Sequence, residues 1–176
     1  MHERIRSLCT TALFTTLLIV GAWLVIPITS PPYTMQSFVL FCAFWLLPFK
    51  QSSTAVILYL LMGAIGLPVF AGFEGGFGVF LEPTKGYLFG FLLMPLFMLG
   101  DKKRGTWGRV IRCALSMTVC YACGALWYIV GYSGFTWGGV LAAMVQCVLP
   151  FIIPDAIKLA AAVLVCKRME PLLTRL

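Results

Sequence analysis

Two residues of opposite charge, Asp155 and Lys158, stand three positions apart in a stretch of the chain that is otherwise apolar. If this stretch is helical, both side chains project from one face and lie within reach of one another. An ionisable group at membrane depth is costly, so it marks a functional site by default. Two interpretations remain open. The pair either neutralises itself as a structural ion pair, or it offers a donor and an acceptor to a polar ligand.

A glycine-rich loop, residues 68–83 (PVFAGFEGGFGVFLEP), bears on this choice. Glycine allows sharp chain reversals and close approach of the backbone to a ligand, and we assign Gly72 and Gly76 to such contacts. A purely structural ion pair gives no reason for such a loop on the same side of the membrane. The loop therefore favours the ligand-binding interpretation of Asp155 and Lys158.

Three further candidate ligand contacts lie at the expected outer surface. Lys85 begins an apolar span directly after the loop, Tyr87 follows it, and Gln36 opens another span beside Thr34 and Ser37. Each has a second explanation: a lysine can snorkel to the headgroups, an aromatic ring can belong to the interfacial belt, and an amide can bond a neighbouring helix. The loop's two acidic residues are expected to be solvated charges at the rim, and these are Glu74 and Glu82.

The composition places the chain in a lipid bilayer. Hydrophobic residues make up 61% of its 176 residues, charged residues only 11%, and the mean hydropathy is +0.97. A soluble core of this size could not hide so many apolar side chains. The net charge of +7 comes from a few basic residues per loop, which is the orientation signal of a polytopic protein. We therefore expect a bilayer as partner and no nucleic acid.

Apolar runs separated by prolines, glycines and charges predict an all-α integral membrane protein, a bundle of six transmembrane helices. The predicted spans are residues 7–26, 33–49, 52–67, 84–100, 107–130 and 145–166. Of the thirteen Lys and Arg residues, all but Lys85 and Lys158 fall beside segment ends that can lie on one side, including the cluster at residues 101–104. This assignment places both termini in the cytoplasm and the glycine-rich loop outside, between the third and fourth helices.

The last span is the least regular, because Pro150 and Pro154 interrupt it. It is either a kinked helix that runs through the prolines, or a shallow outer helix that precedes a short final one. If Pro154 occupies the first turn of the last helix, Asp155 and Lys158 lie near its outer end. The free N–H groups and the dipole of that end would then favour an anion.

The sequence lacks the motifs that several common kinds of catalysis and nucleotide binding require. The sequence has no GxxxxGK[ST], HExxH or GxSxG motif, and its single histidine, His2, stands at the N-terminus. The seven cysteines are scattered through apolar runs without His or carboxylate clusters, so we expect no metal site and no cofactor. What remains is a solute-binding membrane protein and not an enzyme. Its energy, if transport is active, comes from another polypeptide or an ion gradient.

A surface for such a partner is indicated in the first span. Ala12 and Thr16 form a small-xxx-small pair that lets another helix approach closely. Ordinary packing within the bundle explains the pair nearly as well.

Three segments of the chain resemble one known family. The run LYLLMGAIGLPVFAGFEGGFGVFLEPTKGYLFGF at residues 58–91 and the run LPFIIPDAIKLAAA at residues 149–162 closely resemble the BioY family. The YTMQS sequence at residues 33–37 is similar to the start of that family's second span. The members of this family are the biotin-specific membrane subunits of energy-coupling factor (ECF) transporters.

The resemblance implies a six-helix substrate-capture subunit in the bacterial cell (inner) membrane that binds biotin from outside with high affinity. Such subunits work with a transmembrane coupling subunit and a pair of cytoplasmic ATP-binding subunits. Asp155 and Lys158 match the family's biotin-binding aspartate and lysine, and residues 72–78 match its lid over the ligand. Which charged residue holds which group of biotin stays open, since Lys158 and Lys85 both suit the carboxylate or the ureido carbonyl.

The chain departs from the family pattern at three positions. Glu82 stands where many relatives have glycine, Lys85 where a small residue is common, and Thr16 where an alanine usually pairs with Ala12. The alternative functional class is a solitary or ion-coupled vitamin permease, which would need no ATP-binding subunits. A purely structural subunit would bind no small molecule at all.

Overall fold

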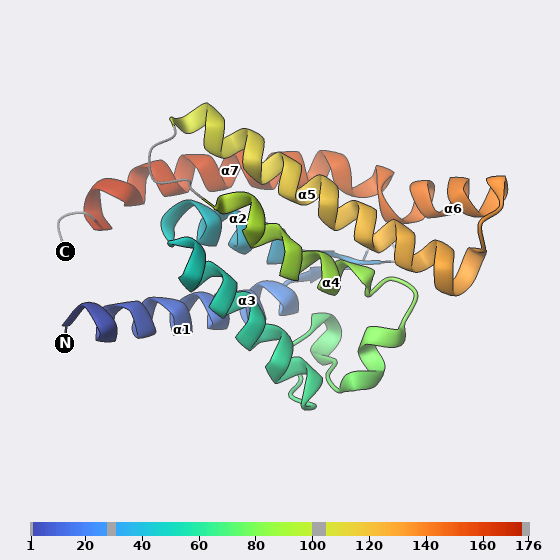
Figure 1. The fold of residues 1–176 in the computed structure, drawn as a ribbon, viewed down its shortest axis with the longest axis horizontal. Helices are drawn as coiled ribbons and strands as arrows, with labels where there is room; N and C mark the ends of the chain where they lie inside the picture. The colour runs from blue at the N-terminus through green and yellow to red at the C-terminus, as the bar shows by residue number, and fades with distance from the viewer. Residues whose placement is uncertain (1, 28–30, 100–104, 174–176) are drawn as a thin grey trace.

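The computed structural model of the chain describes residues 2–27, 31–99 and 105–173, and it is mostly helical (Figure 1). Helices dominate because a segment in hydrocarbon must satisfy its backbone hydrogen bonds internally. The elements run in the order α1 (His2–Trp23), β1 (Val25–Ile26), β2 (Tyr33–Thr34), α2 (Gln36–Leu46), α3 (Phe49–Ala64), η1 (Ala71–Phe73), η2 (Phe77–Leu81), α4 (Gly86–Leu93), η3 (Met94–Met98), α5 (Thr106–Tyr128), η5 (Ile129–Ser133), α6 (Trp137–Cys147) and α7 (Leu149–Leu173).

The predicted all-α, six-helix membrane bundle is confirmed, with α6 and α7 following one another as the sixth helical segment. Within the described residues, three helical segments are long and apolar enough to cross a bilayer, at Glu3–Trp23, Thr106–Ser133 and Trp137–Pro171. Shorter apolar helices occupy Gln36–Leu46 and Gly86–Met98. The basic cluster expected on the cytoplasmic side, at residues 101–104, lies outside the described residues.

The last segment is interrupted at Val148, and α7 then continues through Pro154. Val148 has φ −124° and ψ −61°, which ends α6 one residue before α7 begins. Pro154 lies inside α7 and not in its first turn, so the condition for a helix-start effect at Asp155 is not met. Asp155 therefore stands in the second turn, where the stabilising effect of a helix N-terminus on negative charge has largely faded. Of the two alternatives for this span, the structure agrees with the nearly continuous helix.

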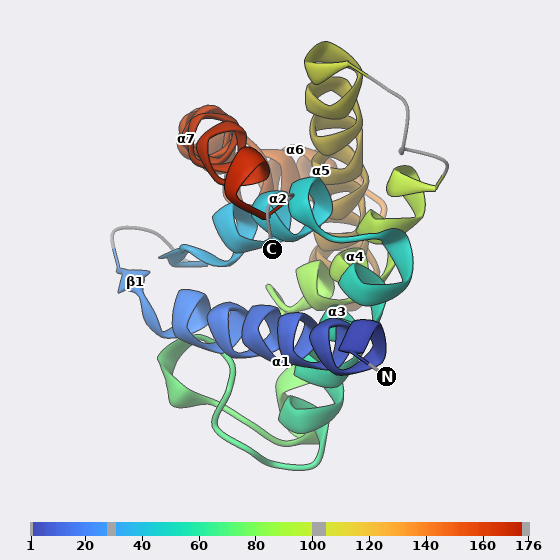
Figure 2. The same ribbon diagram turned by 90° about the vertical axis from the view of Figure 1, so that its left-hand side faces the viewer.

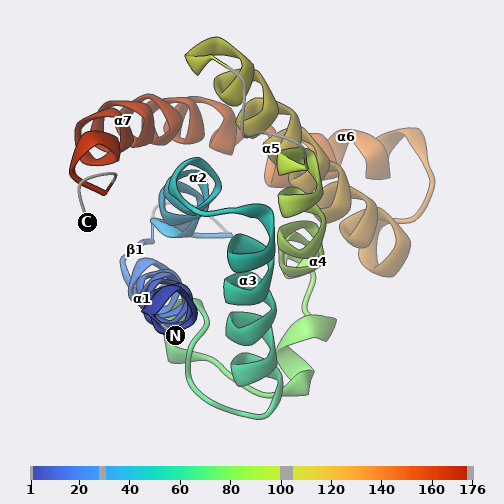
Figure 3. The same cartoon turned by 60° about the vertical axis from the view of Figure 1, so that its left-hand side comes forward.

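The helices pack in pairs, with α1 against α3, α2 against α7 and α4 against α5 (Figure 2). Figure 3 shows α3 and α4 side by side, which joins the first pair to the last. Glycines let α4 and α5 approach closely. A Cβ atom at Gly90 would lie 2.8 Å from the Cα of Cys120, and one at Gly86 would lie 3.0 Å from the Cα of Gly124. Only glycine fits at such distances, as is typical of helix contacts in membranes.

The buried core draws large apolar side chains from several elements, and the outer surface is apolar as well. Leu18 of α1, Phe41 of α2 and Tyr59 of α3 are almost completely buried. On the outside, Trp137 and Ile153 are 91% and 71% exposed. An apolar exterior suits a protein whose surroundings are lipid tails.

The end of α1 is tied to the glycine-rich loop. The Trp23 indole N–H donates a hydrogen bond to the carbonyl oxygen of Pro68 at 2.9 Å, and the rings of Trp23 and Phe73 have centroids 5.0 Å apart. Beyond α1, a two-residue antiparallel ladder pairs Val25 with Thr34 and Ile26 with Tyr33. This ladder, which lies just before the start of α2, was not predicted from the sequence.

Candidate functional site

Asp155 and Lys158 form the predicted ion pair on one face of α7. The Lys158 ammonium lies 2.9 Å from Asp155 Oδ1, and the side chains of Lys158 and Asp155 are 13% and 5% exposed, respectively. Both charged groups are thus largely buried. The attraction between two charges is stronger in the protein interior than in water. A buried pair is expensive to desolvate, so it persists only where additional hydrogen bonds satisfy the remaining oxygens and protons.

Two further helices supply those hydrogen bonds. Ser37 of α2 donates its hydroxyl proton to Asp155 Oδ1 at 2.6 Å and accepts from Lys158 Nζ at 3.1 Å. Tyr121 of α5 donates to Asp155 Oδ2 at 2.7 Å. A carboxylate has about four lone-pair sites. Hydrogen bonds from Ser37, Tyr121 and Lys158 use three of the sites on Asp155. Asp155 is therefore held in one orientation by α2, α5 and α7 together, with acceptor capacity for one more donor.

The pair is not sealed among side chains, because a cavity reaches it. The empty space along this cavity, with the adjoining open solvent included, amounts to about 730 Å³. Its walls carry Asp155, Lys158, Lys85, Gln36 and Tyr87, which are five of the seven predicted ligand contacts. The other lining residues are Pro31, Pro32, Thr34, Ser37, Phe70, Ala71, Thr84, Leu88, Phe91, Met117, Tyr121 and Phe151.

Gln36 and Tyr87 have protein partners for their polar groups. The Gln36 amide donates to the Tyr59 hydroxyl and accepts from the Thr34 hydroxyl at 3.0 Å. The bond to Tyr59 joins α2 to α3, as the helix-bonding interpretation of Gln36 expected. The Tyr87 hydroxyl donates to the carbonyl oxygen of Cys147, while its ring centroid lies 5.9 Å from that of Phe151. Tyr87 therefore offers the cavity an aromatic surface and not a hydroxyl.

Lys85 caps the start of α4 and is paired with both acidic residues of the glycine-rich loop. Its ammonium donates to Glu74 and lies 3.3 Å from Glu82 Oε2. The two glutamates are 42% and 44% exposed, so they lie at the rim as expected, but they are not simply solvated. This cation joins the glycine-rich loop to the start of α4, in addition to the contacts of the loop with Trp23.

Gly72 and Gly76 lie in the loop but do not line the cavity, whose wall takes the neighbouring Phe70 and Ala71. Both glycines have a left-handed backbone, with φ of 75° and 101°. Residues with a Cβ rarely adopt this conformation. Their role in this structure is therefore to shape the loop, and only through the loop do they affect the cavity.

The predicted partner-docking pair is exposed. Ala12 and Thr16 lie on the side of α1 that faces away from the bundle, and the Thr16 hydroxyl donates to the carbonyl oxygen of Ala12 at 3.0 Å. With this proton used within its own helix, Thr16 presents a compact surface. Packing within the bundle does not explain the pair, since the neighbouring helices contact the other face of α1.

The cavity combines apolar walls with a few hydrogen-bonding groups at fixed positions. Such a combination suits recognition of a small amphipathic molecule. Within the described residues there is no group of His, Cys, Asp and Glu side chains that could hold a metal ion. The residues of the cavity wall can donate hydrogen bonds, accept them and pair with charges, and these are the interactions that bind a small ligand.

Two polar residues of the site, Tyr121 and Ser37, were not among the ligand contacts expected from the sequence. Tyr121 contributes a hydroxyl from within an apolar span, 34 residues from Asp155 in sequence. A polar atom in such a span is a weak signal, because the tyrosines of membrane helices serve many purposes. Ser37 follows Gln36, and only its position in α2 shows that it touches both charges.

Comparisons with known proteins agree with this architecture. The sequence model described as the BioY family matches residues 1–175 of the chain. A biotin transporter BioY from Thermotoga maritima is 36% identical over 169 residues, which cover 95% of this chain and 97% of that protein. A probable biotin transporter BioY from Pyrococcus horikoshii is 35% identical over 160 residues, covering 90% and 93%.

A solved structure is similar over nearly the whole chain. It is the crystal structure of the S-component for biotin from an ECF-type ABC transporter, and the match has a TM-score of 0.81 at 26% identity. The match covers 97% of this chain and 93% of that one. With a full-length family match, near full-length relatives and a common fold, the chain belongs to the BioY family.

Proposed function

We propose that this protein binds biotin and takes it up across the cell membrane as the substrate-specific subunit of an ECF-type transporter. The observation that carries the proposal is the Asp155–Lys158 pair, oriented by Ser37 and Tyr121 at the wall of a cavity. Its relatives in Thermotoga maritima and Pyrococcus horikoshii carry the names of biotin transporters, and the similar solved structure is a biotin S-component.

Biotin matches the cavity group by group. Its ureido ring has two N–H donors and one carbonyl acceptor, its thioether ring is apolar, and its tail ends in a carboxylate. Among the described residues that line the cavity, Asp155 is the only carboxylate, so it accepts from a ureido N–H. Phe70, Phe91 and Phe151 give the apolar rings a surface. The ion-pair partners of Lys85, unlike that of Lys158, lie outside the cavity wall, and this supports Lys85 as the proposed partner of the ligand carboxylate.

Energy for transport comes from separate subunits, since the chain has no nucleotide-binding motif of its own. A transmembrane coupling subunit would pack on the exposed side of α1, where Ala12 and Thr16 allow close approach of another helix. The ATP-binding subunits would act through that coupling subunit. The protein is a multi-pass membrane protein, and a bacterial cell (inner) membrane suits this assembly.

Both termini are assigned to the cytoplasm in this proposal. The start of α1 and the end of α7 lie at the same end of the molecule (Figure 1). Basic residues gather there, at Arg4 and Arg6 near one terminus and at Lys167 and Arg168 near the other. Positive charge beside membrane spans favours the cytoplasmic side. The glycine-rich loop then faces the exterior, from which the ligand enters.

Titration calorimetry of the purified protein with biotin tests the proposal. We expect one site per chain and a Kd well below micromolar, while a protein that binds no biotin would refute it. Uptake into proteoliposomes then separates transport classes. Vesicles with this chain alone should not accumulate biotin, and vesicles that also contain the coupling and ATP-binding subunits should do so with ATP. Accumulation by the chain alone would instead identify a solitary or ion-coupled permease.

A further inference from the structure

Lys85 stands between the cavity and two carboxylates. Its side chain lines the cavity and is only 16% exposed, and its ammonium is paired with Glu74 and Glu82. Neither glutamate belongs to the cavity wall. Lys85, Glu74 and Glu82 together carry a net charge of −1. The two glutamates therefore more than neutralise the positive charge of Lys85.

This arrangement differs from the one around Lys158. There a single carboxylate, Asp155, meets a single ammonium, and Ser37 and Tyr121 complete the hydrogen bonds. An anionic group of a ligand that approaches Lys85 has to share the ammonium with two carboxylates that are already in place. Anions that share one cation also repel each other, so each anion is bound more weakly than it would be alone.

We propose that Glu74 and Glu82 determine specificity for the ligand's tail, acting through Lys85. The two glutamates lower the preference of the site for a free carboxylate and let it accept a ligand whose tail ends in an uncharged amide. The ligand class is then ureido-ring compounds with either an acid or an amide tail. This inference rests on the proposed biotin function and adds to it the breadth of substrates.

The size of the effect follows from the distances. A ligand carboxylate at hydrogen-bond distance from Lys85 would lie roughly 5–7 Å from each glutamate carboxylate. Both glutamates are partly exposed, so an effective dielectric constant of about 40–80 applies. Removing one of these negative charges should then strengthen binding of the free acid by about threefold to fifteenfold. An amide tail carries no charge and should be nearly indifferent to the change.

The test compares biotin with biotinamide by titration calorimetry in the wild type, Glu74→Gln and Glu82→Gln. The measured quantity is the ratio of the Kd for biotinamide to the Kd for biotin. We expect this ratio to rise about threefold to fifteenfold in each variant. A change in the folded fraction would affect both ligands equally and leave the ratio unaltered, so the ratio reports the contacts made at the tail.

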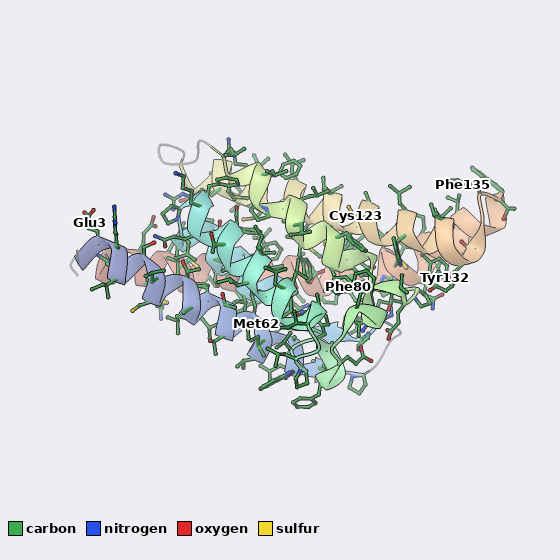
Figure 4. The ribbon with its side chains drawn as sticks, turned by 60° about the horizontal axis from the view of Figure 1, so that its bottom comes forward. Glu3, Met62, Phe80, Cys123, Tyr132 and Phe135 are labelled. Atoms are coloured by element: carbon green, nitrogen blue, oxygen red, sulfur yellow. The ribbon has the colours of Figure 1, made fainter. Side chains whose placement is uncertain are left out.

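Two further variants complete the design. Glu3→Gln is the matched control, since Glu3 lies near the free end of α1, well away from Phe80 of the loop region (Figure 4), and its ratio should equal that of the wild type. Lys85→Gln should lower the ratio, because the group that favours the acid is gone. If the wild type binds no biotin, the proposed function is wrong. If it binds biotin but the ratio is unchanged in the Glu74, Glu82 or Lys85 variants, this inference is overturned.

Discussion

Replacing Asp155 with asparagine removes the charge that faces Lys158 while keeping the size of the side chain. In the structure, this carboxylate accepts hydrogen bonds from Lys158, Ser37 and Tyr121. Asparagine has one acceptor oxygen in place of two, and its amide group donates where Tyr121 also donates. The substitution therefore leaves a buried ammonium without its counter-ion and at least one hydroxyl without an acceptor.

The expected loss of affinity is large. Truncating one partner of a buried, hydrogen-bonded charge pair costs about 2–5 kcal/mol. At 1.4 kcal/mol per tenfold change, the Kd for biotin should rise by about 30-fold to several thousand-fold. The buried Lys158 charge should also destabilise the folded protein, by an amount of similar size. Calorimetry in detergent measures the first effect, and thermal unfolding followed by tryptophan fluorescence measures the second.

A double variant separates a binding role from a merely structural one. Asp155→Asn combined with Lys158→Gln removes both charges, so no unpaired charge remains and stability should recover toward that of the wild type. Binding should stay as weak as in the single variant, because the acceptor for the ureido group is still missing. A double variant that is stable and binds biotin with wild-type affinity would refute the reasoning and leave the pair a structural element.

Three further outcomes are expected. Tyr121→Phe should weaken biotin binding about tenfold, since an orienting hydrogen bond to a carboxylate contributes about 1.5 kcal/mol, and an unchanged Kd by calorimetry would exclude Tyr121 as a positioning residue. Ala12→Leu should leave the Kd for biotin unaltered yet prevent co-purification with the coupling subunit; retained co-purification would place the docking surface elsewhere. Gly90→Ala should lower thermal stability by about 1–3 kcal/mol, because its Cβ would meet Cys120, whereas Gly78→Ala, which meets nothing within 4 Å, should be nearly silent.

The charged candidates for the site could be recognised in the sequence because a charged side chain within a membrane is energetically unfavourable. A charge in an apolar stretch needs a reason, which is why Asp155, Lys158 and Lys85 stand out from the amino-acid order alone, and all three line the cavity. The six-helix architecture was predictable for a similar reason, since long apolar runs have few alternatives to helix in a bilayer.

The parts that were missed depend on geometry that spacing does not encode. Tyr121 is one hydroxyl among many aromatic residues, and only the packing of α5 against α7 brings it to Asp155. The pairing of Lys85 with Glu74 requires the backbone reversals of the loop. The sequence left the course of the last helix past Pro154 open, because neighbouring groups in a bundle can satisfy the backbone atoms that a proline leaves unpaired.

Helix α1 carries both the surface proposed for the coupling subunit and Trp23, which contacts the glycine-rich loop. Midway along this helix lies the exposed face proposed for the coupling subunit, and at its far end one indole holds the loop beside the cavity by a hydrogen bond and a ring contact. A coupling subunit that moved α1 would therefore act on the same helix that holds the loop. In the proposed assembly, docking of the coupling subunit and the position of the loop beside the cavity would thus be linked through α1.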